Sequence, residues 1–304
     1  MKKLNQAIAM SLGVLAVSPA LANEAALAHQ WTFNDGTAND SVGTAHGTLS
    51  NGATISEGQL ILDGIDDYVR TSTIDSPIST KTLMVWATLD NLIQRSGGLL
   101  TIEHASIDQF DSIVYGERIP NQWIAGSTRL QRNVPDNGGK PETELSEVFI
   151  AIVYHSDNSI EIYRNGQIYA SPYTKGVLQT YNATTTDILL GVRHFHRIGE
   201  ASTVDGTDAY FAGKINEARL YDTALGWDEI QAIYSAGPVI DTNPDDGFCT
   251  EPEPTTITRN LKIHIPEAIY QAPEGDMKLW VDFKYVPNQD GRLLFEVTEY
   301  GQVE

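Results

Sequence analysis

Between residues 30 and 221 the chain is a succession of short apolar runs separated by turn residues, and this pattern constrains its fold more than any other feature. Gln59–Leu62 runs into Asp63-Gly64, and Tyr68–Arg70 resumes soon afterwards. Val148–Tyr154 is almost wholly apolar, which is typical of a strand buried between two sheets. Many short strands at near-regular spacing, with Gly, Asn and Asp between them, predict a mainly β sandwich.

One hairpin is predicted from local sequence. Ser159–Arg164 alternates polar with apolar residues, Asn165-Gly166 follows, and Gln167–Tyr169 continues. Asn-Gly accepts the positive φ angles that a type I′ turn requires. The two runs are therefore expected to pair directly.

A helix, a linker and a small β segment are predicted after the strands. Thr223 is expected to cap the helix, and Gly237-Pro238 to end it. Residues 238–256 are rich in acids and prolines, which predicts a linker. Residues 257–304 are expected to form a small three-stranded β module. Its predicted strands are Leu261–Ile265, Leu279–Tyr285 and Leu293–Val297, with a turn over residues 288–291.

The N-terminus predicts export from the cell. Two lysines precede an apolar stretch, Ala7–Val17, that is too short to span a bilayer, and Ala20-Leu21-Ala22 supplies a small-x-small cleavage site. A cut after Ala28 fits the same rule but is farther from the apolar stretch. We therefore expect a signal peptide over residues 1–22 and a periplasmic or secreted mature protein without membrane insertion.

The charge balance narrows the classes of partner. The chain has 40 acidic residues against 20 lysines and arginines, a net charge of −20. Such a chain repels phosphate backbones and anionic lipids, so nucleic acid is not an expected partner, and it suits cations such as calcium. Cys249 is the only cysteine, so no intramolecular disulfide forms, and stability is expected to come from the core, with a bound metal as a candidate for an additional contribution.

Several sequence fragments occur in an order that is typical of one protein family. They are Trp31–Gly36, Asn39–Ser41, His46-Gly47, Leu62–Val69, Leu83–Leu89, Ile160–Gly166, Phe211–Tyr221, Ala224-Leu225 and Asp228–Ile230. In this order they resemble bacterial LamG-like jelly-roll domains of the concanavalin A-like lectin/glucanase superfamily, over roughly residues 29–237. The resemblance implies a sandwich of two curved antiparallel sheets, which we assign to residues 23–237.

No enzyme is expected. Glucan hydrolases on this scaffold resemble one another in a strand that carries Glu-x-Asp-x-Glu, whose acids point to one face. The nearest run here, Glu142–Glu147, lies in a polar segment without strand character, and we expect it to be a solvated acidic loop. The sequence also lacks a Gly-x-Ser-x-Gly elbow and a Gly-rich phosphate loop.

A structural calcium site is an expectation from the resemblance, because LamG-like domains often hold one calcium ion. Asp40 lies near the domain start, and Glu217 lies on the last strand, which this fold places beside the first. Calcium takes six to eight oxygen ligands, so these two carboxylates and carbonyls of the Gly43–Gly47 turn are expected to hold it. The alternative is that Asp40 caps a turn and that Glu217 pairs with Arg219. The acids at positions 66 and 67 are expected to form a turn.

A ligand site is expected where aromatic and basic residues gather. Sugars stack on aromatic rings and are bound by planar polar groups. The predicted ligand-binding residues are Tyr115, Arg118, Trp123, Arg193 and His194, with Arg129 and Arg132 nearby in the sequence. Arginines concentrated in an acidic protein favour an anionic glycan. The alternative is that Trp123 belongs to the core, as Trp86 is expected to, and that the arginines balance acidic surface.

Two classes of function follow. The first is a non-catalytic, lectin-like carbohydrate-binding module, stabilised by calcium, whose partner is a glycan or polysaccharide. The second is an adhesion or assembly factor that binds another protein through residues 257–304, because exposed strand edges accept a partner strand.

Overall fold

The structure is a computed structural model, and it describes residues 27–134, 138–195, 209–239, 279–287 and 293–302. The predicted signal peptide, most of the predicted linker and the predicted strand Leu261–Ile265 lie outside these ranges. The chain divides into two compact units, residues 1–243 and 244–304. None of the helices in the described part of the chain is long and apolar enough to cross a membrane.

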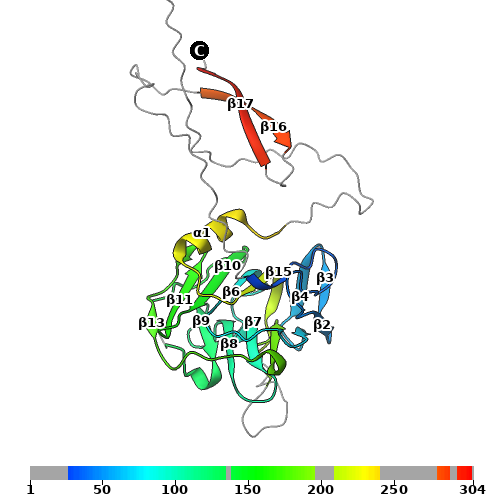
Figure 1. The fold of residues 1–304 in the computed structure, drawn as a ribbon, viewed down its shortest axis with the longest axis vertical. Coiled ribbons are helices and arrows are strands. Elements are labelled where there is room, and N and C mark those ends of the chain that lie inside the picture. The colour runs from blue at the N-terminus through cyan, green and yellow to red at the C-terminus, as the bar shows by residue number, and fades with distance from the viewer. Residues whose placement is uncertain (1–26, 135–137, 196–208, 240–278, 288–292, 303–304) are drawn as a thin grey trace, which may run out of the picture. The chain divides into compact units, whose positions relative to one another are not determined.

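The first unit contains two antiparallel sheets (Figure 1). In the first sheet the strand order is β12-β11-β10-β6-β15-β4-β3, with β1 paired to β15 and β13 paired to β11. The last strand, β15, therefore lies between β6 and both β4 and β1, as expected for the first and last strands of this fold. The strands are β1 (Leu27–Trp31), β3 (Thr54–Ser56), β4 (Gln59–Asp63), β6 (Lys81–Leu89), β10 (Val148–Tyr154), β11 (Ser159–Arg164), β12 (Gln167–Ile168), β13 (Tyr173–Thr174) and β15 (Ala212–Tyr221).

The second sheet has the order β2-β5-β14-β7-β8-β9. Its strands are β2 (Gly47–Ser50), β5 (Tyr68–Thr71), β7 (Gly97–His104), β8 (Phe110–Tyr115), β9 (Trp123–Ser127) and β14 (Thr186–Leu190). Two short 3-10 helices join strands: η2 (Thr128–Leu130) follows β9, and η3 (Ala183–Thr185) precedes β14. The mainly β, two-sheet antiparallel jelly-roll sandwich is confirmed.

The main hydrophobic core fills the space between the two sheets. Alternate residues of β10, such as Ile150 and Ile152, join alternate residues of β14, such as Ile188 and Leu190, in one buried cluster. All seven residues of β10 are buried, as its apolar run predicts. The other face of β10 is also covered, because Phe149 lies in a second cluster.

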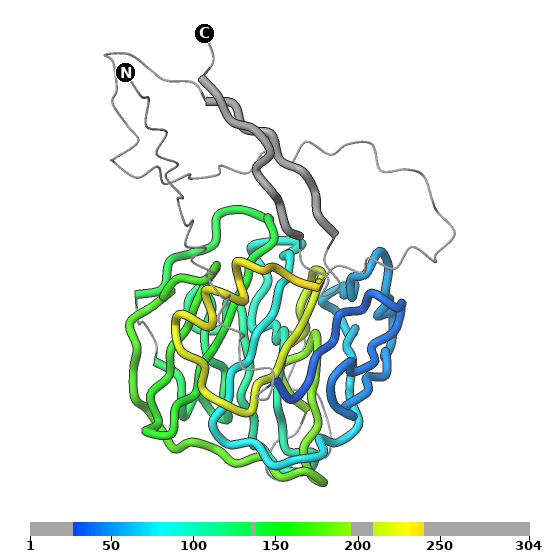
Figure 2. The backbone as a smooth tube through the Cα atoms, turned by 45° about the horizontal axis from the view of Figure 1, so that its top comes forward, coloured from blue at the N-terminus to red at the C-terminus, as the bar shows by residue number. Residues whose placement is uncertain are grey.

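This second cluster lies beneath α1 (Trp227–Ala236), the one α-helix among the described residues of this unit, which packs on the outer face of the first sheet through Ile230 and Ile233 (Figure 2). Trp86 belongs to the same cluster, with only 2% of its surface exposed, as predicted. Thr223 does not cap the helix. The N-cap is Gly226, whose backbone N–H donates to Glu229, while the carbonyl of Thr223 accepts from Thr82 on β6.

The hairpin formed by β11 and β12 is confirmed. Tyr163 pairs with Ile168 and Arg164 with Gln167. Asn165 and Gly166 have φ angles of 50° and 73°, the positive values that a type I′ turn requires. The Asn165 side chain also accepts a hydrogen bond from the backbone N–H of Phe149, which ties the turn to β10.

In the second unit, β16 (Leu279–Pro287) and β17 (Leu293–Gln302) form a two-stranded antiparallel sheet. Two of the three predicted strands are thus present. Their pairing places Val281 opposite Tyr300, and Phe283 opposite Val297. The predicted turn at residues 288–291 lies outside the described ranges.

Candidate functional site

A small pocket lies where β8 begins and β9 ends. It has a volume of about 120 Å³. Its lining residues come from the β7–β8 loop, from the end of β9 with the turn after it, and from the segment before η3: Ile107, Asp108, Gln109, Phe110, Ser127, Thr128, Gln131, Arg132 and Gln179. We call it the β8–β9 pocket. Its volume is below the roughly 300–1,000 Å³ of sites that hold drug-sized ligands. It therefore has room for one small chemical group of a ligand and not for a whole oligomeric ligand.

Side-chain hydroxyls hold the walls of the pocket in place. Thr128 Oγ1 accepts from the backbone N–H of Phe110 (3.2 Å) and donates to the carbonyl of Asp108 (3.0 Å). Ser127 Oγ accepts from the backbone N–H of Arg132 (2.9 Å). Gln109 donates to the carbonyl of Thr180 (3.0 Å), which joins the β7–β8 loop to the segment before η3. The pocket is therefore a fixed feature of the fold.

The turn beside the pocket is strained. Arg129 and Leu130 have φ angles of 46° and 57°, so two consecutive residues with side chains adopt the left-handed region. Each such residue costs on the order of 1–2 kcal/mol, and backbone strain of this kind clusters at functional sites. Arg129 lies 3.5 Å from Asp108 across the pocket edge. Single residues with side chains adopt positive φ angles at several other turns of the described chain, so the distinguishing feature here is two such residues in succession.

A buried charge cluster supports the pocket from below. Asp111 accepts from Arg132 (3.0 Å) and lies 2.9 Å from the ammonium of Lys81, and all three side chains are 4% exposed or less. Both cations also lie over the ring of Tyr154, at 4.6 Å from its centroid, and Lys81 lies 4.9 Å from that of Tyr181. Burial lowers the pKa of Lys81, and Asp111 only partly opposes this. Two basic side chains thus share one buried carboxylate, which holds Arg132 in place beside the pocket.

The pocket suits a neutral polyhydroxyl group. Its lining includes the amides of three glutamines, the carboxylate of Asp108 and the hydroxyls of Ser127 and Thr128. Such groups donate and accept the hydrogen bonds that bind sugar hydroxyls. Phe110 gives it one aromatic residue, but that ring is 4% exposed and stacks on His194 at 4.2 Å. Recognition here must therefore depend on hydrogen bonds more than on stacking. Sequence reasoning missed Asp108, Gln131 and Gln179, because residues of three distant segments meet here.

Two of the predicted ligand-binding residues are core residues, which corrects the expectation. Tyr115 and Trp123 are each 0% exposed, and their ring centroids lie 4.9 Å apart in the core between the sheets. The indole N–H of Trp123 donates to Glu142 (2.6 Å). Neither ring presents a face to a ligand.

The remaining predicted residues separate into two groups. His194 is 3% exposed and stacks on Phe110, so it packs behind the β8–β9 pocket. Arg193 donates to Glu117 (2.5 Å), next to the exposed Arg118 in the turn between β8 and β9. The structure thus brings Arg118 and Arg193 to one turn, at the opposite end of β8 from the pocket.

Glu142 is not part of a solvated loop, which is a second correction. It is 4% exposed and accepts from Trp123 and from both Nε and Nη2 of Arg164, at 2.6 and 2.7 Å. A buried carboxylate with three donors fixes the position of the segment that carries it. No local sequence pattern indicates this burial, because the partners Trp123 and Arg164 lie on β9 and β11, distant from Glu142 in the chain.

The predicted calcium ligands Asp40 and Glu217 both contact Gln30 on β1. Asp40 accepts from the backbone N–H of Gln30 (3.0 Å), and Glu217 from its side-chain amide (2.6 Å). Asp40 also accepts from His29 and from three backbone N–H groups of the turn that follows it. Glu217 also accepts from Arg219 and from the N–H of Val239. Calcium at this place stays a prediction, and it requires some of these donors to be displaced.

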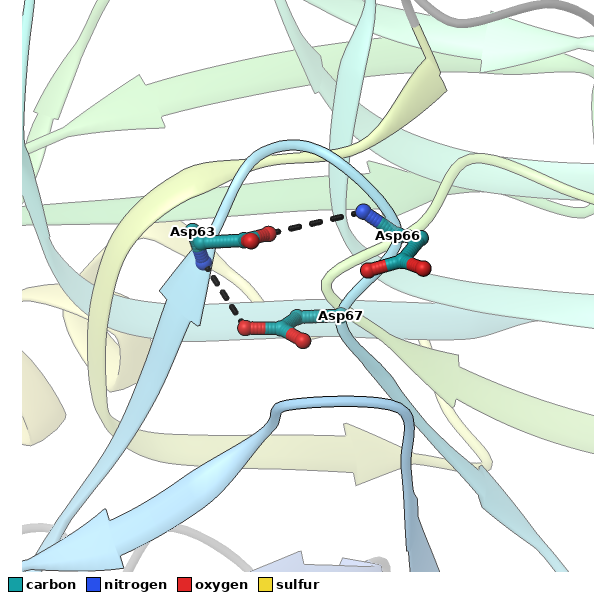
Figure 3. A group of neighbouring side chains, drawn as sticks. All are labelled: Asp63, Asp66 and Asp67. Atoms are coloured by element: carbon teal, nitrogen blue, oxygen red, sulfur yellow. Dashed lines mark hydrogen bonds between the residues drawn. The ribbon is translucent and has the colours of Figure 1, made fainter.

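Among the described residues, one further group of carboxylates lies within reach of a shared cation: Asp63, Asp66 and Asp67, in the β4–β5 turn (Figure 3). Asp67 accepts from the N–H of Gly52 (2.6 Å) and of Asp63 (3.1 Å), and Asp63 accepts from that of Ile65 (2.7 Å). These bonds shape the turn. Asp66 and Asp67 thus lie in a turn, as expected.

Two carboxylates also face each other on the outer face of the second sheet. Glu103 on β7 and Asp187 on β14 are cross-strand partners, and they are 1% and 5% exposed. Arg70 donates to Asp187 through Nε (2.7 Å) and Nη2 (2.5 Å), and the N–H of Phe195 donates to Glu103 (3.0 Å). Sequence reasoning missed this pair because the two strands are far apart in the chain.

Comparisons with solved structures agree with this fold. Domain 4 of AbnA, an extracellular arabinanase from Geobacillus stearothermophilus solved in complex with arabinotriose, matches with a TM-score of 0.52 and 16% identity, over 67% of this chain and 96% of that domain. The binding domain of botulinum neurotoxin serotype D/C matches with a TM-score of 0.51 and 11% identity, over 70% of this chain and 52% of that one. Botulinum neurotoxin type C, in a study of its interaction with two ganglioside molecules, matches with a TM-score of 0.50 and 13% identity, over 70% and 51%.

A search of the curated proteins gave no match. The family comparison gave a positive result: the model of the concanavalin A-like lectin/glucanases superfamily matches residues 63–231, more than half of the chain. These residues run from the end of β4 into α1 and include both walls of the β8–β9 pocket. The chain belongs to the concanavalin A-like lectin/glucanase superfamily.

Proposed function

We propose that the first unit is a non-catalytic carbohydrate-binding module that takes one sugar residue in the β8–β9 pocket. The pocket itself carries this proposal, since it combines fixed walls, a strained turn and amide and carboxylate side chains. Membership of a superfamily of lectins and glucanases supports a glycan as the partner. The arabinanase domain solved with arabinotriose supports the same class of ligand for this fold.

The carboxylate pair on the second sheet, Glu103 and Asp187, supports a non-catalytic role. Retaining glycosidases need two carboxyl groups roughly 5–5.5 Å apart, one of them free to protonate the leaving group. Asp187 is instead held by two nitrogens of Arg70, and Glu103 is 1% exposed. Neither group is placed to meet a polysaccharide. Release of reducing sugar by the wild type, with its loss in Glu103→Gln, would refute this part of the proposal.

A glycan array followed by isothermal titration calorimetry tests the binding role. Gln131→Ala and Gln179→Ala each remove one amide from the pocket, and we expect each to weaken binding of the best saccharide roughly fivefold to tenfold, the value of one or two hydrogen bonds. Gln167→Ala is the matched control, because Gln167 is an exposed glutamine on β12. Equal affinities in all four proteins would rule out the pocket as the binding site.

Calcium and export belong to the same proposal. We propose that a calcium ion stabilises the module and that the mature protein is periplasmic or secreted. A thermal unfolding scan with calcium and with a chelator tests the first, with Asp40 and Glu217 as the predicted ligands. N-terminal sequencing of the protein from the periplasm or medium tests the second, and we expect the mature chain to begin at Asn23.

A second candidate function is protein binding through the C-terminal strands. The pairing of β16 and β17 supports it: Val281, Phe283 and Tyr285 are opposite Tyr300, Val297 and Phe295 in a two-stranded sheet. A two-stranded sheet is marginally stable on its own, and a partner strand at its edge stabilises it. Deletion of residues 257–304 should then abolish co-purification of a partner while leaving the sandwich folded.

A further inference from the structure

Arg95 and Arg118 differ from the other arginines in the described part of the chain, because no carboxylate there lies within 4 Å of either. Each of the other described arginines forms an ion pair with a carboxylate: Arg70, Arg129, Arg132, Arg164, Arg193 and Arg219. The chain has twice as many acidic as basic residues, so a shortage of acids does not explain this. Two guanidinium groups without a carboxylate partner therefore stand out in a protein of net charge −20.

Arg95 is held by the backbone. Its Nε donates to the carbonyl of Gly116 (2.5 Å), and its Nη2 to that of Glu117 (3.3 Å). These acceptors are neutral, so they fix the guanidinium without cancelling its charge. Gly116 permits this approach, because it has a φ of 69° and a Cβ there would lie 2.8 Å from the carbonyl oxygen of Gln94.

Arg118 is exposed and lies in the same turn, one residue beyond the carbonyl that Arg95 contacts. The acid between them, Glu117, is engaged by Arg193 at 2.5 Å. Burial raises the pKa of Glu117, and the neighbouring Arg193 and Arg118 only partly offset this. Three guanidinium groups, those of Arg95, Arg118 and Arg193, therefore lie around one carboxylate at this turn, and the backbone fixes the direction of one of them, Arg95.

We propose that Arg95 and Arg118 form an anion-binding subsite in the β8–β9 turn, which binds a carboxylate or sulfate group of an acidic polysaccharide. A guanidinium presents parallel N–H donors that match the oxygens of such groups. Arg95 loses little side-chain entropy on binding, because the backbone already holds it. This subsite rests on the proposed carbohydrate-binding function and names the class of polysaccharide that it favours.

The test compares matched pairs of polymers that differ only in charge. The probes are polygalacturonate and its methyl ester, and chondroitin sulfate and its desulfated, methyl-esterified form. We expect the wild type to bind at least one acidic polymer about tenfold or more tightly than its neutral form in 50 mM salt. The preference should shrink in 300 mM salt, because exposed charges are screened.

Arg118→Gln and Arg95→Gln should each reduce this preference severalfold without changing affinity for the neutral form. Lys214→Gln is the matched control, because it removes one positive charge from an exposed position on β15. Circular dichroism verifies that each variant folds. The subsite is overturned if the wild type prefers neither acidic polymer, or if Lys214→Gln lowers the preference as much as Arg118→Gln. If the subsite is overturned but neutral glycans still bind at the β8–β9 pocket, the proposed carbohydrate-binding function stands. If the wild type binds no glycan at all, both the subsite and the carbohydrate-binding function are refuted.

Discussion

The two ends of the β8–β9 hairpin use charge in opposite ways. At the pocket end, Arg132 and Lys81 share the carboxylate of Asp111 in the core, and Arg129 lies beside Asp108. At the turn end, Arg95 and Arg118 have no carboxylate within 4 Å among the described residues. The first arrangement fixes the shape of a pocket, whereas the second leaves charge available to a ligand.

This difference follows from where the charges lie. A buried ion loses its hydration and must be paired, so charges in the core act on stability. An exposed arginine keeps its hydration and contributes little to folding, so it is free to take part in binding. Substitutions at the two ends should therefore separate stability from affinity.

The largest effect is expected from Asp111→Ala. This change leaves Lys81 and Arg132 buried without a carboxylate, and breaking such a pair costs about 3–5 kcal/mol in the free energy of unfolding. Urea unfolding followed by tryptophan fluorescence measures it. A loss below about 1 kcal/mol would show that water reaches the cluster and that the charges are not buried.

Trp123→Ala tests the core beneath the turn end. Trp123 is fully buried and bonded to Glu142, so its truncation should cost about 3–5 kcal/mol. Trp227→Ala is the matched control, because Trp227 is 47% exposed on α1 and should cost less than about 1.5 kcal/mol. Similar losses for the two tryptophans would contradict the placement of Trp123 in the core.

Asp40 is a buried carboxylate that accepts several hydrogen bonds, and its contribution to stability should depend on pH. Burial acts to raise its pKa, but hydrogen bonds from His29 and from three backbone N–H groups outweigh this and lower it to about 2. Since the folded-state pKa lies below the unfolded value of 3.8, Asp40 stabilises the fold by about 2 kcal/mol above pH 4, and this is lost as the pH falls from about 4 towards 2. Asp40→Asn should be less stable at pH 7 and lack this part of the acid dependence. If the free energies of unfolding of the wild type and of Asp40→Asn fall in parallel between pH 4 and 2, Asp40 is not the source of this acid dependence.

The smallest effect on stability is expected from Arg118→Gln. Its guanidinium is exposed and forms no ion pair within the described residues, so the free energy of unfolding should change by less than about 0.5 kcal/mol. The same variant is expected to lose its preference for acidic polymers. A destabilisation above 1 kcal/mol would mean that Arg118 supports the turn and not a ligand.

The sequence predicted the sandwich, because alternation and turn residues are local signals. Asn165-Gly166 and the apolar run of β10 are read within one segment of the chain. The proposed ligand site is predicted only in part, because its lining depends on which distant segments of the chain meet. From the sequence, Trp123 is expected in a ligand site, with the core as the alternative, and Glu142 in a solvated loop. The structure buries both, because Glu142 bonds to Trp123 on β9 and to Arg164 on β11.

A crystal structure of the first unit soaked with its best-binding oligosaccharide tests the central claim most directly. The account predicts one sugar residue in the β8–β9 pocket, with hydroxyls bonded to Asp108, Gln131 or Gln179. A sugar bound elsewhere on the sandwich, with this pocket empty, would contradict it.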